Sequence, residues 1–270
     1  MTRTAIDDEA AIRELRGQFR SQGFCITPPI VPMDLIQRVI PRMEAVVRGE
    51  YETGEPPFAI HFTPEDGPEK LKKIDQPQLC DDTILELIAH PALGEWAARI
   101  MEAKLIQAWA VQLLIKPPGC GEKGLVGWHQ DKHYWPYWEG EVFTAWVALS
   151  EVTEDSGPVR YVAGSNRWGY LEGGDFFGTD DELQRDKIRL PDGAEWKEVP
   201  AVMGPGQAIF HHRHTFHGSG PNLSDKPRLS FAIHLRTEKS RPVFGENDQT
   251  SYYISNLNDI RKAPILFEES

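Results

Sequence analysis

The chain has 270 residues, of which 40% are hydrophobic, and this is enough for one large globular domain with a sizeable core. Its formal net charge is −12, which disfavours nucleic acid as a partner, because that binding depends on neutralising phosphates with Lys and Arg. No stretch approaches the ~18–20 apolar residues of a membrane span, and Met1 to Glu9 lacks the apolar segment of a secretory signal. Three scattered cysteines, Cys25, Cys80 and Cys120, argue against a disulfide framework and favour the reducing cytoplasm.

The first part of the chain is predicted to be mostly helical. Apolar residues recur there three and four positions apart, which is typical of amphipathic helices. On this spacing we expect helices over residues 7–22, 33–48, 81–90 and 91–103. A short strand is expected over 23–27, and the Pro-rich stretch 49–67 is expected to be a loop. Residues 7–103 therefore form the predicted helical part.

From Leu105 onward the pattern changes to short apolar runs, which are typical of strands. We expect these strands over residues 105–115, 142–149, 159–163, 202–210 (after a turn) and 226–235. They define a β-rich core over about 105–237. No internal repeat or domain linker interrupts the sequence, so we expect a single domain over 1–270.

Two segments fall outside this core. Residues 166–198 are an insertion with Gly173-Gly174 and the acidic run Asp180-Asp181-Glu182, and both a lid and a disordered acidic surface loop remain open for it. Residues 240–270 are a C-terminal extension, expected to pack on the core or on a second subunit. Monomer and homodimer remain equally open.

The sequence Trp128-His129-Gln130-Asp131 is a candidate metal motif. In a strand, side chains two residues apart point to the same face, so His129 and Asp131 could reach one ion. Two imidazoles and one carboxylate fill one face of an Fe(II) coordination sphere and leave the other face open for dioxygen and a co-substrate. Taken alone, this short motif also occurs as ordinary surface sequence.

The third ligand has to come from a cluster of four histidines downstream. We choose His217, because it comes just before Gly218-Ser219-Gly220-Pro221-Asn222, which is a turn signal. His211, His212 and His214 are expected at the end of the preceding strand, as polar and partly exposed rim residues.

Arg228 lies in the apolar stretch 226–235. Arginine is rarely buried without a partner, and its planar guanidinium binds a carboxylate with two hydrogen bonds. We therefore expect Arg228 to bind a carboxylate-bearing co-substrate, with an ordinary structural salt bridge as the alternative.

Together these stretches resemble a known family. The resemblance is carried by His129-Gln130-Asp131, Trp146-Val147-Ala148-Leu149, Gly157-Pro158, Gly164-Ser165-Asn166, Gly206-Gln207-Ala208-Ile209-Phe210, His217-Gly218-Ser219-Gly220-Pro221-Asn222 and Arg228. In this order they resemble the phytanoyl-CoA dioxygenase family of Fe(II)/2-oxoglutarate oxygenases, from about Gln18 to Leu235. The resemblance implies a mainly β fold with flanking helices, a double-stranded β-helix (jelly roll, cupin-like).

The resemblance also implies roles for particular residues. His129, Asp131 and His217 would hold Fe(II), Arg228 would bind the distal carboxylate of the co-substrate 2-oxoglutarate, and Ser219 would assist it. The second substrate would be dioxygen. Halogenating relatives lack the carboxylate ligand, so the presence of Asp131 argues against halogenation.

Four further residues are expected near 2-oxoglutarate on the same resemblance: Lys73, Gln112, Trp146 and Gln130. Lys73 could instead be a solvated lysine of the run 70–73, and Trp146 could be ordinary core. Gln112 lies in an apolar stretch, where a buried amide needs a partner.

Aromatic residues surround the metal motif, and aromatic side chains beside a metal commonly form the wall of a substrate pocket. We expect His133, Tyr134 and Trp135 to contact the substrate, a small organic molecule with apolar surface.

The predicted activity is hydroxylation, with decarboxylation of 2-oxoglutarate to succinate. Desaturation, cyclisation or epimerisation on the same iron centre remains open, as does a non-catalytic cupin-like metal-binding module. A zinc hydrolase lacks an evident general base beside the ligands.

Overall fold

The computed structural model describes residues 9–178, 180–243 and 251–269. Its first four helices are α1 (Glu9–Gln22), α2 (Met33–Val47), α3 (Asp82–Ile88) and α4 (Pro91–Met101), in agreement with the predicted helical part. The predicted start of the first helix at Asp7 lies outside the described residues. The Asp81 side chain caps α3 by accepting a hydrogen bond from the Ile84 amide, and Pro91 occupies the first turn of α4, where no backbone donor is needed.

The larger of two main sheets has the strand order β1-β10-β7-β12-β4-β3-β2, and β14 also pairs with β4. Its strands are β1 (Phe24–Ile26), β2 (Ala59–Ile60), β3 (Lys72–Asp75), β4 (Leu105–Lys116), β7 (Val142–Ala148), β10 (Ala208–His212), β12 (Arg228–Arg236) and β14 (Ile265–Glu268). The smaller sheet has the order β5-β11-β8-β9. Its strands are β5 (Val126–His129), β8 (Val159–Val162), β9 (Glu198–Pro200) and β11 (His217–Ser219). Strand pairing within both sheets is antiparallel.

The remaining elements are short. A two-stranded ribbon joins β6 (Trp138–Glu139) to β13 (Arg241–Pro242). The remaining α-helices are α5 (Asp181–Lys187) and α6 (Ser251–Ser255). The 3-10 helices are single turns: η2 (Pro64–Asp66), η3 (Pro77–Leu79), η4 (Gly121–Gly124), η5 (Asp131–His133) and η6 (Ser165–Arg167).

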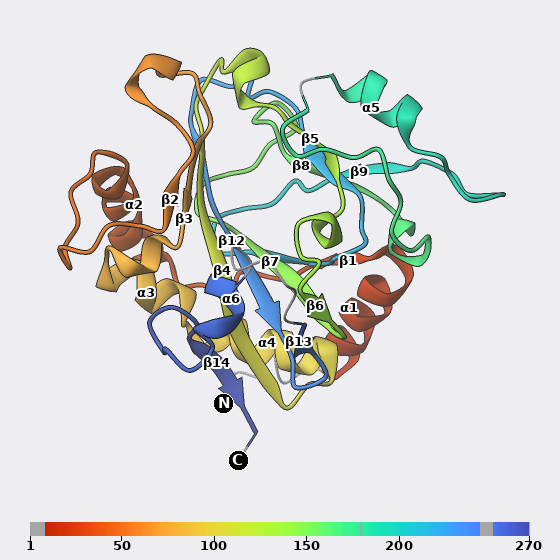
Figure 1. Cartoon of the computed structure of the whole chain (residues 1–270), viewed down its shortest axis with the longest axis horizontal. Helices are drawn as coiled ribbons and strands as arrows, with labels where there is room; N and C mark the ends of the chain where they lie inside the picture. Colours follow the sequence, from red (N-terminus) through yellow and green to blue (C-terminus); the bar gives the residue numbers. More distant parts are fainter. Residues whose placement is uncertain (1–8, 179, 244–250, 270) are drawn as a thin grey trace.

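The sheets and helices form layers. One core cluster joins the apolar faces of α1, α2, α3 and α4 to one face of the larger sheet. A second cluster lies between the sheets and includes Trp146 and Ala232 of the larger sheet and Val159 and Tyr161 of the smaller one. Figure 1 shows β5, β8 and β9 on one side of the long strands β4, β7 and β12. Two facing antiparallel sheets with helices on one outer face are the predicted jelly roll.

Several short strands were missing from the prediction, among them two at the edge of the larger sheet. The stretch 49–67, expected as a loop, contains β2, and the lysine-rich run at 70–73 continues into β3. Both strands are short and pair at the edge of the sheet, β3 against β4 and β2 against β3. Their pairing with β4 is a tertiary effect, which local composition does not signal.

Strand β4 contains a bulge that changes which side chains face inward. Across from it on β12, His234 pairs with Ala110 but the next residue, Leu235, pairs with Ala108, so Trp109 is the extra residue. A bulge breaks the usual alternation of side chains. As a result Trp109 and Ala110 both line the cavity described below, whereas Ala108 packs in the helix-facing core.

The segment 166–198 and the C-terminal extension both pack on this framework. Gln184 in α5 accepts a hydrogen bond from the Trp128 amide and donates one to the carbonyl of Asp175, which ties the segment to β5. In the extension, β14 pairs with β4, and Tyr252 stacks on Phe58. The described part of the extension therefore packs on the core of its own chain, one of the two arrangements expected for it.

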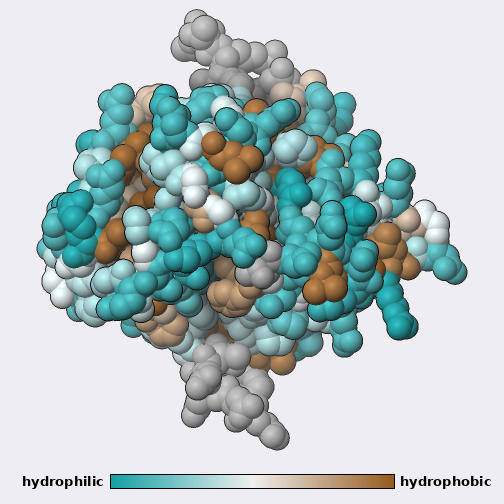
Figure 2. Space-filling model, turned by 90° about the horizontal axis from the view of Figure 1, so that it is seen from above, coloured by the Kyte–Doolittle hydropathy of each residue, from teal (hydrophilic) through white to brown (hydrophobic). Residues whose placement is uncertain are grey.

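The surface carries no dominant apolar area on the face shown in Figure 2, which is mostly hydrophilic with small separate hydrophobic patches. Among the described residues, no helix combines the length and the apolar character that crossing a bilayer requires.

Candidate metal centre and co-substrate pocket

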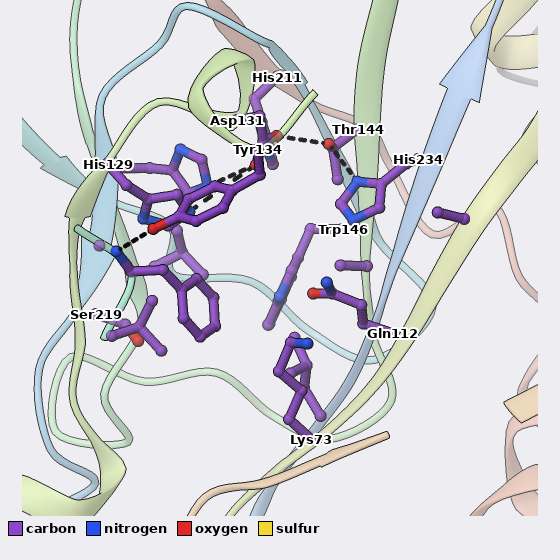
Figure 3. A pocket seen from close by; sticks show the side chains of 18 of the residues that line it. Lys73, Gln112, His129, Asp131, Tyr134, Thr144, Trp146, His211, Ser219 and His234 are labelled. Atoms are coloured by element: carbon purple, nitrogen blue, oxygen red, sulfur yellow. Dashed lines mark hydrogen bonds and ion pairs between the residues drawn. The ribbon is translucent and has the colours of Figure 1, made fainter. Parts of the chain in front are cut away.

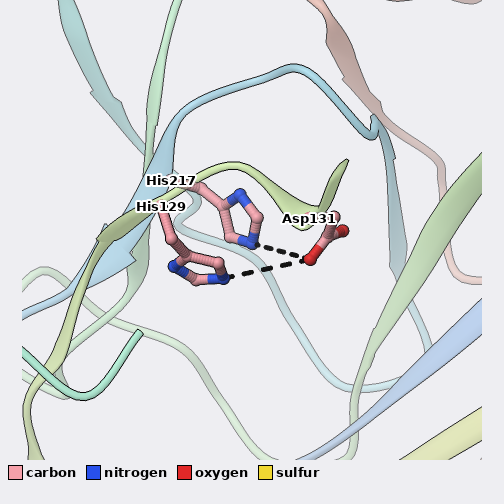
Figure 4. A group of neighbouring side chains, drawn as sticks. All are labelled: His129, Asp131 and His217. Atoms are coloured by element: carbon pink, nitrogen blue, oxygen red, sulfur yellow. Dashed lines mark ion pairs between the residues drawn. The ribbon is translucent and has the colours of Figure 1, made fainter. Parts of the chain in front are cut away.

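His129, Asp131 and His217 meet at the inner face of the smaller sheet (Figure 4). His129 ends β5, and it is the direct cross-strand partner of His217, the first residue of β11. Asp131 Oδ1 lies 3.9 Å from His129 Nε2 and 3.8 Å from His217 Nε2. One ligand atom from each residue lies within 4.8 Å of the others, and all three side chains are buried. This donor set fits a single metal ion.

The hydrogen bonds of the two histidines suit metal binding. His129 Nδ1 lies 2.8 Å from the carbonyl of Gly127, and His217 Nδ1 lies 3.0 Å from the carbonyl of Thr215. A carbonyl only accepts, so in each ring Nδ1 carries the proton and Nε2 presents its lone pair toward Asp131. Burial lowers the pKa of both histidines, most strongly at His217, and keeps the rings neutral. Neutral imidazole is the form that binds a metal.

The second oxygen of Asp131 is held by the protein. Thr144 Oγ1 donates to Oδ2 at 2.8 Å, and His211 Nε2 donates to it at 3.1 Å. Burial by itself would raise the pKa of Asp131, but nearby His217 and the hydrogen bond from His211 outweigh it and hold that pKa below its ordinary value. An ionised carboxylate with one oxygen already bonded offers Oδ1 to the metal.

The expectation for His211 was wrong. It was predicted as a partly exposed rim residue, but it is 2% exposed and contacts Asp131. The reason is that β10 extends two residues further than predicted, to His212. Side chains alternate along it, so Ile209 packs between the sheets, Phe210 faces the helices, and His211 turns inward again. His212 and His214 are half-buried, as a rim position implies.

The proposed geometry of the HxD motif also needs correction. Strand β5 ends at His129, and Asp131 opens the turn η5 instead of continuing the strand. Gln130 between them is still extended, with φ −110° and ψ 132°, so the two ligand side chains keep the same-face relation of a strand.

A cavity of about 300 Å³ connects this centre to Arg228. Figure 3 shows part of its wall, with Asp131 and Thr144 near one end and Lys73 and Gln112 near the other. The three ligand residues line one part of it, together with Thr144 and His211, and Ser219, Trp146 and Arg228 line another. Side chains from both sheets therefore surround one space, which is the arrangement expected of a small-molecule site.

Arg228 is buried at the start of β12, and no described carboxylate forms an ion pair with it. Its guanidinium donates to the carbonyl of Gly157 and lies 5.2 Å from the ring centre of Trp146, while Nε is buried without a partner. Burial lowers its pKa to about 10, which leaves it charged at neutral pH. A buried, unpaired guanidinium is costly unless an anion joins it. The ordinary salt bridge considered as an alternative is therefore absent from the described residues.

Ser219 lines the cavity, as does Arg228. Its hydroxyl forms a hydrogen bond with Lys116, which does not line the cavity. Lys116 Nζ lies 2.6 Å from Ser219 Oγ and is fully buried at the end of β4. No pattern in the sequence singles out Lys116, because its position at the end of an apolar strand is typical of an exposed lysine.

The structure brings Trp146, Lys73 and Gln112 into the cavity wall as well. Trp146 belongs both to the hydrophobic core and to the wall of the cavity, because it packs between the sheets and its ring faces Arg228. Lys73 is buried, not solvated, and its Nζ lies 2.8 Å from Asp75 Oδ1. The amide of Gln112 has no hydrogen-bond partner among the described residues, so it is free to bind a ligand.

The structure does not place Gln130 in the wall of the cavity. Its amide nitrogen donates to the carbonyls of Gly169 and His214, and its amide oxygen accepts from the Leu171 amide. Gln130 is absent from the residues that line the cavity. Gln130 lies between His129 and Asp131 in the sequence. In an extended backbone, the side chain of the middle residue points away from the side that its two neighbours face.

Of the three residues predicted to contact the substrate, two line the cavity and one does not. Tyr134 and Trp135 line the cavity, as predicted for substrate contacts. His133 does not: it is exposed, and its Nδ1 lies 2.7 Å from the hydroxyl of Tyr170. The 3-10 turn η5 directs these consecutive side chains to different sides.

A further aromatic residue in the wall of the cavity, Trp109, was not predicted. Trp109, aimed inward by the bulge in β4, contacts Trp135, Tyr137 and Tyr253 at interplanar angles of 84–90°. These rings and His234 line the cavity together. Because Trp109 lies in an apolar strand, only the register with β12 reveals its direction.

The family described as phytanoyl-CoA dioxygenase (PhyH) matches residues 19–230 of the chain, from the end of α1 into β12. The chain belongs to the phytanoyl-CoA dioxygenase family.

Relatives with curated names are distant in sequence. The chain is 24% identical to dioxygenase olcK of Penicillium canescens, over 67% of this chain and 56% of that protein. It is 25% identical to a probable alpha-ketoglutarate-dependent hypophosphite dioxygenase of Stutzerimonas stutzeri, over 67% and 63%. With human peroxisomal phytanoyl-CoA dioxygenase it shares 25% identity, over 85% and 70%. The chain thus spans between half and two thirds of the length of the first two relatives.

Solved structures support the fold. The non-haem alpha-ketoglutarate-dependent carbocyclase SnoK from nogalamycin biosynthesis superposes with a TM-score of 0.69 at 23% identity, covering 88% of each chain. The epimerase SnoN from the same biosynthesis gives 0.66 at 22% identity, covering 88% of this chain and 87% of that one. EctD from S. alaskensis, solved with 2-oxoglutarate and 5-hydroxyectoine, gives 0.64 at 19% identity, over 88% and 78%. The jelly roll predicted from sequence is confirmed.

Proposed function

We propose that this member of the phytanoyl-CoA dioxygenase family is an Fe(II)- and 2-oxoglutarate-dependent dioxygenase that hydroxylates a small organic substrate. In the overall reaction, one oxygen atom of dioxygen enters a substrate C–H bond and the other enters succinate, while 2-oxoglutarate loses CO2. Bound iron supplies the oxidising chemistry, and the protein supplies position and a dry pocket.

The observation that carries this proposal is the pairing of two features in one cavity. A buried three-residue donor set lies on one side, and on another lies a buried Arg228 that has no carboxylate partner among the described residues. A metal-binding module without a co-substrate would need only the first. Burying the second is costly unless an anion binds there, and a co-substrate carboxylate is that anion.

The residues then have distinct tasks. His129, Asp131 and His217 would hold the metal, with Thr144 and His211 fixing the orientation of the carboxylate. Arg228 would bind the distal carboxylate of 2-oxoglutarate, and Ser219 would donate a further hydrogen bond to it. Trp146 covers the guanidinium and excludes water from that end.

The substrate would occupy the aromatic part of the cavity. Tyr134, Trp135 and Trp109 offer apolar walls there, and Phe176 and Phe177 of the segment 166–198 line the same space. We assign this segment the role of a cover over the substrate. The three cysteines are buried and unpaired, which agrees with function in the reducing cytoplasm.

An anaerobic titration tests the proposal. Fe(II) followed by 2-oxoglutarate should produce a weak visible metal-to-ligand charge-transfer band, and Asp131→Ala should abolish it. Asp155→Ala, which removes an exposed carboxylate outside the cavity, is the matched control and should leave the band unchanged. Iron binding without a band in the unmodified protein would overturn the co-substrate assignment and favour the metal-binding module.

A further inference from the structure

Lys116 is a buried lysine whose surroundings accept hydrogen bonds. Its Nζ lies 2.6 Å from Ser219 Oγ, 2.5 Å from the carbonyl oxygen of Gly220 and 3.4 Å from the carbonyl oxygen of Ser219. Hydrogen bonds to three oxygens favour the charged form of this amine, and an ammonium group has three donors and no acceptor, so each oxygen takes one of its protons. The Ser219 hydroxyl oxygen is therefore an acceptor toward Lys116.

This fixes the direction of the Ser219 hydroxyl. The oxygen already accepts from Lys116, and the hydroxyl proton has no acceptor among the described residues. Ser219 lines the cavity, whereas Lys116 does not. The proton is therefore available on the cavity side, where a bound acceptor can take it.

Lys116 also lies beside the other cation of this region. Arg228 is its direct cross-strand partner in the pairing of β12 with β4. Burial, and then the nearby Arg228, lower the pKa of Lys116. No described carboxylate forms an ion pair with either side chain. Like charges opposite each other in a sheet are destabilising, so two adjacent buried cations point to an anion that completes the site.

We infer that Lys116 is a positioning residue for the co-substrate: it holds the Ser219 hydroxyl so that its proton faces the distal carboxylate that Arg228 binds. The inference rests on the proposed function and deepens it. It makes the site selective for 2-oxo acids that carry a second carboxylate, and it assigns part of that selectivity to a side chain that never touches the ligand.

The test compares 2-oxoglutarate with 2-oxopentanoate, which has the same chain length but no distal carboxylate. Dissociation constants come from the anaerobic Fe(II) charge-transfer band of the full chain. The variants are Lys116→Met, Lys116→Gln, Ser219→Ala and the double variant Lys116→Met/Ser219→Ala. Lys104→Met is the matched control, because Lys104 precedes β4 at its other end and its side chain is 75% exposed.

Lys116→Met should weaken 2-oxoglutarate binding about tenfold or more, since a charge-assisted contact to the carboxylate is lost. Lys116→Gln keeps an N–H donor and should lie between Lys116→Met and the unmodified protein. The affinities for Fe(II) and for 2-oxopentanoate should stay unchanged. In the Ser219→Ala background, Lys116→Met should add less than about a threefold loss, because the hydroxyl that it positions is gone.

Three outcomes would overturn the inference: unaltered 2-oxoglutarate binding in Lys116→Met, equal losses for the two acids, or an equally large loss in the Ser219→Ala background. If Lys116→Met does not fold, Lys116→Gln is assessed by the same criteria. These failures differ from failure of the proposed function, which would show as no charge-transfer band in the unmodified protein.

Discussion

Thr144 Oγ1 lies 2.8 Å from Asp131 Oδ2, and this contact ties the carboxylate ligand to the larger sheet. Thr144 is in β7, whereas Asp131 follows β5 of the smaller sheet. The hydroxyl proton of Thr144 goes to the carboxylate, so its oxygen accepts from Nδ1 of His234, 2.9 Å away. One threonine thus connects a metal ligand to the aromatic wall of the cavity.

Removing this hydroxyl should weaken metal binding. Thr144→Val keeps the shape of the side chain but leaves Oδ2 of Asp131 with a single donor among the described residues, His211, so Fe(II) affinity should fall about 10–100-fold. Anaerobic Fe(II) titration measures this. Thr237→Val is the matched control, because Thr237 is equally buried and its hydroxyl bonds Glu141, away from the cavity. Equal Fe(II) affinity in the two variants would contradict the role given to Thr144.

Arg228 should control the affinity for 2-oxoglutarate. Arg228→Lys keeps a positive charge but loses the planar pair of donors that matches a carboxylate. We expect the apparent KM for 2-oxoglutarate to rise about 10–100-fold, corresponding to the ~1.5–3 kcal/mol of a hydrogen bond to a charged group. The measurement is succinate formation at varied 2-oxoglutarate. Arg241→Lys, at an exposed ion pair, should behave like the unmodified protein.

Stability should depend on pH through buried neutral histidines. Burial lowers the pKa of His234 from 6.5 to about 4. Burial is also the largest cause that lowers the pKa of His212 and that of His214 to about 4. Between these values the unfolded chain binds more protons than the folded one, so stability is fully present above pH 6.5 and is lost as the pH falls toward 4. Urea unfolding of the metal-free protein between pH 7 and pH 4.5 measures this. His234→Gln should make the dependence shallower, and an unchanged slope would refute the contribution of His234.

A pair of glycine substitutions tests how tightly the C-terminal extension is packed. A Cβ at Gly94 in α4 would come within 2.3 Å of the Leu266 carbonyl oxygen in β14, and that backbone atom has no room to move aside. Gly94→Ala should therefore lower the thermal midpoint. Gly17→Ala in α1 has nothing within 4 Å and should instead stabilise the helix by about 0.5–1 kcal/mol. Differential scanning calorimetry separates the two, and equal midpoints would contradict the close packing.

The residues that carry chemistry in their own side chains were predictable from the sequence. His129, Asp131 and His217 stand out because two imidazoles and a carboxylate suit iron, and Arg228 because an arginine in an apolar strand needs an anion. The order of strands and turns was also readable, since the apolar runs of β4, β7 and β12 are long. The structure places these four residues around one cavity, as the motif pattern indicated.

Other site residues depend on three-dimensional register, which a single sequence does not reveal. Trp109 faces the cavity only because of the bulge opposite His234, and His211 turns inward only because β10 continues past Phe210. Lys116 acquires its surroundings from β11 and β12, both more than a hundred residues away in the chain. Gln130 was misplaced for the opposite reason, because nearness in sequence to two ligands does not decide which way a side chain points.

The cross-strand pair His129–His217 has a consequence for the order of events during synthesis. His129 and Asp131 leave the ribosome well before His217, and the larger sheet also waits for β10 and β12 to pair with β7. Until then, a nascent chain presents only two of its three iron ligands and neither Ser219 nor Arg228. Such long-range pairing is slow to form. If the site binds iron as proposed, reactive iron chemistry would thereby be kept away from the growing polypeptide, whose exposed side chains would be the nearest targets for oxidation.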